Sequence, residues 1–161
     1  MRMLAVLLTG VAVNAAAADM TSPLVEHVRA ANARFAEASA ATAEGYTAIP
    51  CVDGPDGAVT GVRYVNQRYF KDEVPAIGRP QALTYEPGDD GRLTLVAVEY
   101  ITFKGPARLE NQPYRLVAAP NRFGRTPFYE LHVWAWKPNP RGAFADMNPS
   151  VSCEHAHAHG K

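Results

Sequence analysis

The chain has 161 residues, with 16 basic and 16 acidic side chains and a formal net charge of zero at pH 7. This neutral balance excludes attraction of nucleic acid or anionic lipid through bulk charge. The length is typical of one domain that is large enough to bury a hydrophobic core. Binding of a small molecule stays open, and the sequence does not indicate an oligomeric state.

Residues 1–18 have the organisation of a secretory signal peptide. Arg2 supplies the positive charge, and Met3 to Val13 form an apolar stretch too short to span a bilayer. The run Ala16-Ala17-Ala18 fits a cleavage site. We therefore expect a mature protein in the periplasm or outside the cell, with no membrane span after cleavage. The alternative is an uncleaved anchor helix.

Residues 19–153 are expected to form a single domain, followed by a disordered tail over 154–161. Cys51 and Cys153 are the two cysteines of the chain. In an exported protein we favour a disulfide between them, because that compartment permits oxidation. Such a bridge would stabilise the fold by about 4 to 5 kcal/mol through loop closure. The alternative is two separate buried thiols.

The fold class indicated by the pattern is α+β, with one N-terminal amphipathic helix packed on a curved antiparallel sheet of about five strands. Thr21 to Glu44 reads as the helix, with Ser22 as N-cap, Pro23 in the first turn and Gly45 after its end. The strands are expected at these ranges, separated by turns rich in Gly, Pro and Asp: 62–66, 82–86, 92–103, 114–118 and 128–137.

Both faces of the strand over 92–103 are apolar at its centre, so both should be covered. The strict alternation places Leu93, Leu95, Ala97, Glu99, Ile101 and Phe103 on one face. The helix can cover one face only, and we expect the loop after Trp136 to cover the other. In the last strand, alternation places these residues on one side: Phe128, Glu130, His132, Trp134 and Trp136.

Four blocks of the chain carry a resemblance to a known family: GAVTGVRYVN (57–66), RPQALTYEP (79–87), LVAVEY (95–100) and LHVWAWKPNPRGAFADMNPSVSC (131–153). In these blocks the chain resembles a family of exported bacterial proteins of unknown function. The resemblance implies export, one domain and the cysteine pair. Members usually carry a histidine where this chain has Arg63, and their Glu and His match Glu99 and His132. A His/Glu/His set would suit a metal, and Arg63 argues against that metal here.

Glu99 and His132 are the candidate catalytic residues. A carboxylate among apolar neighbours needs a partner or a raised pKa, so Glu99 is either a general acid/base or one half of a structural ion pair, with Arg63 as the expected partner. His132 is either a proton shuttle or metal ligand, or a core histidine that donates to a backbone carbonyl or to Glu99. The structural interpretation is favoured for both.

Three functional hypotheses follow. The first is a cell-envelope binding module whose pocket is lined by Arg63, Tyr64, Glu99, Tyr100, His132 and Trp134, although such aromatic residues more often form core. The second is an enzyme in which Glu99 and His132 act as an acid/base pair or as metal ligands. The third is weak capture of zinc, copper or nickel by the tail histidines His155, His157 and His159. The favoured alternative for the tail is a solvated, disordered end without a function.

Overall fold

The structure is a computed structural model that describes residues 20–51, 59–72, 75–121 and 123–156. The expected signal peptide, and His157 and His159 of the tail, lie outside these residues. Across the part of the chain that is described, no helix has the length and apolarity needed to cross a membrane.

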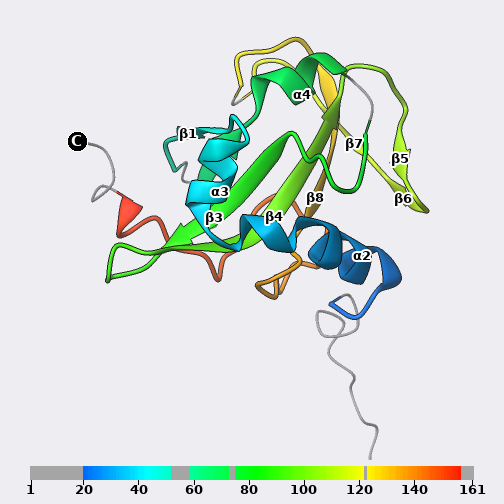
Figure 1. Ribbon diagram of the computed structural model, residues 1–161. Coiled ribbons are helices and arrows are strands. Elements are labelled where there is room, and N and C mark those ends of the chain that lie inside the picture. The colour runs from blue at the N-terminus through cyan, green and yellow to red at the C-terminus, as the bar shows by residue number, and fades with distance from the viewer. Residues whose placement is uncertain (1–19, 52–58, 73–74, 122, 157–161) are drawn as a thin grey trace, which may run out of the picture.

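The core of the fold is a six-stranded antiparallel sheet with the order β1-β2-β3-β4-β8-β7. A separate two-stranded hairpin, β5–β6, extends beside it (Figure 1). The α+β class is confirmed, and the main sheet has one strand more than expected. The strands are β1 Thr47–Ile49, β2 Val62–Val65, β3 Ala82–Pro87, β4 Leu93–Thr102, β5 Arg108–Leu109, β6 Gln112–Pro113, β7 Arg115–Val117 and β8 Phe128–Val133.

The single helix predicted over 21–44 is instead α2 (Pro23–Asn32), a 3-10 turn η1 (Ala33–Ala36) and α3 (Ala38–Ala43). It begins well inside the chain rather than at its N-terminus. Ser22 caps α2 as predicted, since its hydroxyl accepts from the Val25 N–H at 3.4 Å. The helix breaks at Glu37, which is extended. The break leaves the Phe35 carbonyl available to the buried Tyr85 hydroxyl, which donates to it at 2.7 Å.

The helices lie across one face of the sheet (Figure 1). The core beneath them is almost entirely apolar. It joins one side of the helices to alternate residues of β3, β4 and β8, and its main members are Leu24, Val25, Val28, Phe35, Leu83, Tyr85, Leu95, Val98, Tyr100, Leu131 and Val133. We call this side the helix face.

Strict alternation along β4 proves wrong at one point. Thr84 pairs with Ala97 and Tyr85 pairs with Leu95, so Val96 is an extra residue in a β-bulge. Beyond the bulge, Leu95 lies in the core of the helix face, whereas Val96 and Ala97 both pack on the opposite side. Alternation predicted one face for all five residues Leu93, Leu95, Ala97, Glu99 and Ile101. Because of the bulge, Leu93 and Leu95 lie on the helix face and the other three lie on the opposite side.

The opposite side, which we call the loop face, is covered mainly by chain segments without regular structure, and at one end by Phe70 of the short helix α4 (Gln67–Asp72). After β8 the chain folds back, with the Trp134 indole N–H donating to the Ala145 carbonyl at 2.6 Å. Asn148 then forms an isolated bridge with Val59. This confirms the prediction that the loop after Trp136 closes the second face. Because β8 ends at Val133, however, Trp136 packs against the helix-face core and not beside Trp134.

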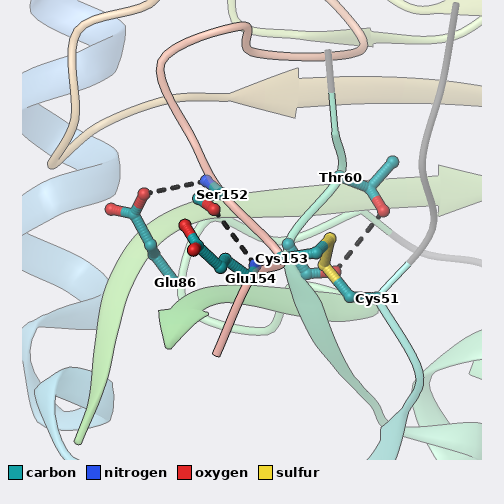
Figure 2. The surroundings of a disulfide bond; sticks show 7 residues. Cys51, Thr60, Glu86, Ser152, Cys153 and Glu154 are labelled. Carbon is teal, nitrogen blue, oxygen red and sulfur yellow. Dashed lines mark hydrogen bonds between the residues drawn. A yellow bond between two sulfur atoms is a disulfide. The ribbon is translucent and has the colours of Figure 1, made fainter. Parts of the chain in front are cut away.

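The predicted disulfide between Cys51 and Cys153 is present, with Cα atoms 5.9 Å apart (Figure 2). It joins the chain just after β1 to the end of the covering loop. Beside it, the Ser152 N–H donates to the Glu86 carboxylate at 3.0 Å. The cover of the loop face is thus attached both covalently and through the end of β3.

Candidate functional site

Charged side chains form a buried row across the loop face, between two apolar clusters. One cluster surrounds Trp134 and the other surrounds Phe128. The register creates the row, because Glu99 of β4 pairs with His132 of β8 and Glu130 pairs with both Ile101 and the edge residue Arg115. We call the resulting group the ion network; its members are Arg63, Glu99, Arg115, Glu130, His132 and Asp146.

Glu99 has the structural partners that the sequence favoured. Its Oε1 lies 3.5 Å from the Arg63 guanidinium and 2.9 Å from His132 Nε2, and all three side chains are fully buried. Arg63 reaches this position from β2, where it lies opposite Thr84 of β3. Its guanidinium also stacks over the Phe123 ring at 5.0 Å. The predicted Glu99–Arg63 pair and Glu99–His132 contact are both confirmed.

His132 lies at the centre of the network, with its ring stacked on that of Trp134 at 6.0 Å between centroids. Burial alone lowers the pKa of this imidazole, but the carboxylates of Glu99 and Glu130 outweigh burial and raise the pKa to about 9. The ring therefore carries a proton at neutral pH, in a group of three carboxylates and two guanidiniums. Such a group has no net charge, which reduces the cost of burying it.

The sequence did not single out the outer half of the network. Glu130 is fully buried and contacts Arg115, whose guanidinium also lies 2.6 Å from Asp146 Oδ2. Arg115 and Asp146 are partly exposed, so they connect the buried row to solvent. Glu130 could have been found from its place two residues before His132 on one face of a strand. Asp146 lies in an irregular loop, and no periodic signal indicates it.

Two residues of the predicted pocket are not brought to this site. Tyr64 and Tyr100 lie on the helix face, where Tyr64 packs edge-on against Tyr85 and the Tyr100 hydroxyl donates to the Ile77 carbonyl at 2.6 Å. Alternation explains the separation, because each is the sequence neighbour of a residue that points to the loop face, Arg63 or Glu99.

A cavity of about 340 Å³ opens at the Arg63 end of the network. It lies between β1, β2, the helix α4 (Gln67–Asp72) and the loop before β8. The sequence missed α4, a short helix whose first N–H groups at Arg68 and Tyr69 bond to the Asn66 side chain. The cavity is lined by Ile49, Pro50, Arg63, Val65, Gln67, Phe70, Phe123 and Arg125. Of the predicted pocket, Arg63 alone lines it.

Glu99, Glu130 and His132 also have the donor types of a metal site, since one ligand atom of each lies within 4.8 Å of the others. All three are buried. Of the tail histidines, His155 is described at a turn after the disulfide and is not part of this group, and the other two lie outside the described residues. The tail-binding hypothesis stays a prediction.

Comparison of the chain with models of protein families, with curated proteins and with solved structures yields no match.

Proposed function

We propose that this protein is an exported domain that binds a small anionic molecule with an apolar body in the Arg63 cavity. This keeps the binding-module hypothesis and moves the pocket from the His132 side of Arg63 to its other side. The observation that carries the proposal is the composition of the lining: two arginines, no acidic residue, and otherwise mostly apolar side chains.

The charge of the lining favours an anion. Arg63 is completely buried, so the field of its guanidinium is weakly screened by water. Arg125 is exposed near it and donates to the Gln67 carboxamide at 3.1 Å, which orients its guanidinium. Arg125 can donate a pair of N–H groups to a carboxylate or a similar planar anion, and the buried Arg63 adds positive charge within the wall.

The remaining walls favour an apolar body on that anion. Phe70 and Phe123 pack edge to face at 5.7 Å between centroids, and Ile49, Pro50 and Val65 complete the surface. Pockets for small ligands are commonly apolar with a few convergent polar groups. Pro50 directly precedes the disulfide at Cys51, so this wall is attached to the covering loop. The cavity is therefore preformed, which lowers the entropic cost of binding.

The expected signal peptide and the disulfide, which is typical of oxidising compartments, support the export that this proposal includes. The enzyme alternative has less support, because neither Glu99 nor His132 lines the cavity. Glu99 instead contacts the Arg63 guanidinium from outside the cavity lining, and holds it in place. In this arrangement the carboxylate has a positioning role.

Benzoate and benzyl alcohol, which share a ring and differ in charge, test the proposal. We expect benzoate to bind in isothermal titration at least tenfold more tightly than benzyl alcohol. Arg125→Ala should weaken benzoate binding about five- to tenfold, since a charge-assisted hydrogen bond is lost at a partly solvated position. Phe123→Ala should weaken both probes, because it removes the wall that they share.

Arg68→Ala is the matched control, since Arg68 is an exposed arginine on the same helix as Gln67 and does not line the cavity. It should leave benzoate binding unchanged. Equal affinity for the two probes would contradict an anion site. Equal effects of Arg68→Ala and Arg125→Ala would contradict the assignment of the cavity.

A further inference from the structure

The side of His132 that faces away from Glu99 has an unusual environment. The Nδ1 atom is buried and forms no hydrogen bond with any described residue. Two carboxylate oxygens lie close to it, Asp146 Oδ1 at 3.4 Å and Glu130 Oε1 at 3.6 Å. Neither contact has the geometry of a hydrogen bond, yet both oxygens lie within 3.6 Å of the same buried nitrogen.

We propose that His132 Nδ1, Glu130 and Asp146 form a binding site for a divalent transition metal of the zinc type. Metal–nitrogen and metal–oxygen bonds of about 2.0 to 2.2 Å in a tetrahedron place neighbouring ligand atoms roughly 3.3 to 3.6 Å apart. The two distances from Nδ1 match this spacing, which is longer than a good hydrogen bond. An imidazole with two carboxylates is a donor set that zinc accepts.

Glu99 supplies the support that such a histidine needs. Its Oε1 lies 2.9 Å from Nε2, the ring nitrogen opposite the proposed metal. Metal-bound histidines usually donate their second N–H to a carboxylate, which fixes the ring orientation and strengthens the ligand. Trp134, stacked on the ring, holds its plane. Glu99 is thus a positioning residue for this site, and Arg63 positions Glu99 in turn.

Arg115 occupies the entrance of the site. Its guanidinium contacts both Glu130 and Asp146 and is 43% exposed, on the edge strand β7. It can turn to solvent without moving the sheet. The ion network then keeps three carboxylates and one guanidinium, so a divalent ion bound beside a neutral imidazole brings its net charge to zero. Arg115 and the metal therefore compete for the same two carboxylates.

This site is separate from the Arg63 cavity, which lies at the other end of the network and contains none of the three ligands. It also differs from the predicted tail site, which would use His155, His157 and His159. Any test must distinguish these two candidate metal-binding sites on one chain. We therefore use the full chain together with a tail variant, His155→Ala/His157→Ala/His159→Ala.

The experiment is titration of the tail variant with Zn²⁺ and with Co²⁺. We expect one equivalent of Zn²⁺ to bind, and Co²⁺ to give the strong visible absorption of a four-coordinate site. Asp146→Asn should weaken Zn²⁺ binding at least tenfold and abolish the Co²⁺ band, because it removes a charged ligand at a partly exposed position. Arg115→Ala should strengthen Zn²⁺ binding about tenfold, because the competing guanidinium is gone.

The matched controls are Asp89→Asn in an exposed turn and Arg108→Ala on the β5–β6 hairpin, and both should bind Zn²⁺ like the tail variant itself. The proposal is overturned if the tail variant binds no Zn²⁺, or if Asp146→Asn binds it unchanged. It is also overturned if Arg115→Ala binds Zn²⁺ no more tightly. Near-ultraviolet circular dichroism of each variant verifies that the fold is retained before titration.

Discussion

The two faces of the sheet are stabilised by different means. The helix face has an apolar core whose buried polar groups are mainly neutral, such as the Tyr85 and Tyr100 hydroxyls, each donating to a backbone carbonyl. The loop face contains a row of buried charges between two apolar clusters. The helices α2 and α3, which satisfy most of their own backbone groups, cover the first face. A loop attached by a disulfide covers most of the second face, and the short helix α4 adds Phe70 at one end.

This difference is the reason that both proposed sites are placed on the loop face. Replacing buried ion pairs with apolar residues of similar size often leaves stability unchanged or raises it. Stability alone therefore does not account for six charged groups on one face. The two sites that we propose lie at the two ends of this row, whereas the helix face serves to hold the strands in register.

The largest expected effect comes from detaching the loop that covers the charged face. Cys51→Ala/Cys153→Ala opens a loop with a sequence separation of 102 residues and should lower the free energy of unfolding by about 4 to 5 kcal/mol. Urea denaturation measures the loss. For comparison, Ser22→Ala on the helix side removes one N-cap and should cost about 1 kcal/mol. Losses of equal size would contradict the contrast between the two covers.

The next largest effect tests the charges themselves. Arg63→Met leaves Glu99 buried without its guanidinium, and we expect a loss of about 3 to 5 kcal/mol in urea denaturation. Adding Glu99→Gln should recover part of that loss, because the uncompensated charge is removed. On the helix face, the volume-conserving change Leu83→Met should cost less than about 1.5 kcal/mol. If Arg63→Met cost as little as Leu83→Met, the buried Glu99 carboxylate would not depend on Arg63.

A smaller effect follows from the protonation of His132. Its pKa is raised to about 9 in the fold, against 6.5 for the free side chain. The stabilisation is therefore fully present below about pH 6.5, and it is lost as the pH rises through about 9. We expect a decline on the order of 3 kcal/mol across that range, measured by urea denaturation with a chelator present. His132→Gln should lack this decline, and a profile identical to that of the unaltered protein would contradict the assignment.

Much of the fold was predictable because the relevant signals are local. The caps at Ser22 and Gly45, the turns and the alternation along β8 depend on neighbours in the chain. What could not be predicted depends on distant contacts. The bulge at Val96 and the helix break at Glu37 each serve packing between elements, and neither has a turn residue to indicate it.

The candidate site shows the same limit. Glu99 and His132 were identifiable as polar residues in apolar strands, and Arg63 as their expected partner. The pocket prediction wrongly included Tyr64 and Tyr100, although alternation places each on the face opposite to its sequence neighbour Arg63 or Glu99. Asp146 reaches the site through a loop, and its position depends on contacts that no sequence pattern specifies, such as the indole of Trp134 bonded to Ala145.

The smallest effect concerns a neutral hydrogen bond on the helix face. Tyr85→Phe removes the hydroxyl that donates to the Phe35 carbonyl at 2.7 Å, so a buried acceptor loses its donor at the helix break. We expect a loss of about 1 to 2 kcal/mol in urea denaturation. Tyr64→Phe is the matched control, because its ring packs against Tyr85 at 5.1 Å and its hydroxyl forms no hydrogen bond with a described residue. It should change stability by less than about 0.5 kcal/mol. If Tyr85→Phe lowered the free energy of unfolding as much as Arg63→Met, loss of a neutral and of a charged partner would cost the same in this sheet. That result would contradict the energetic difference between its two faces.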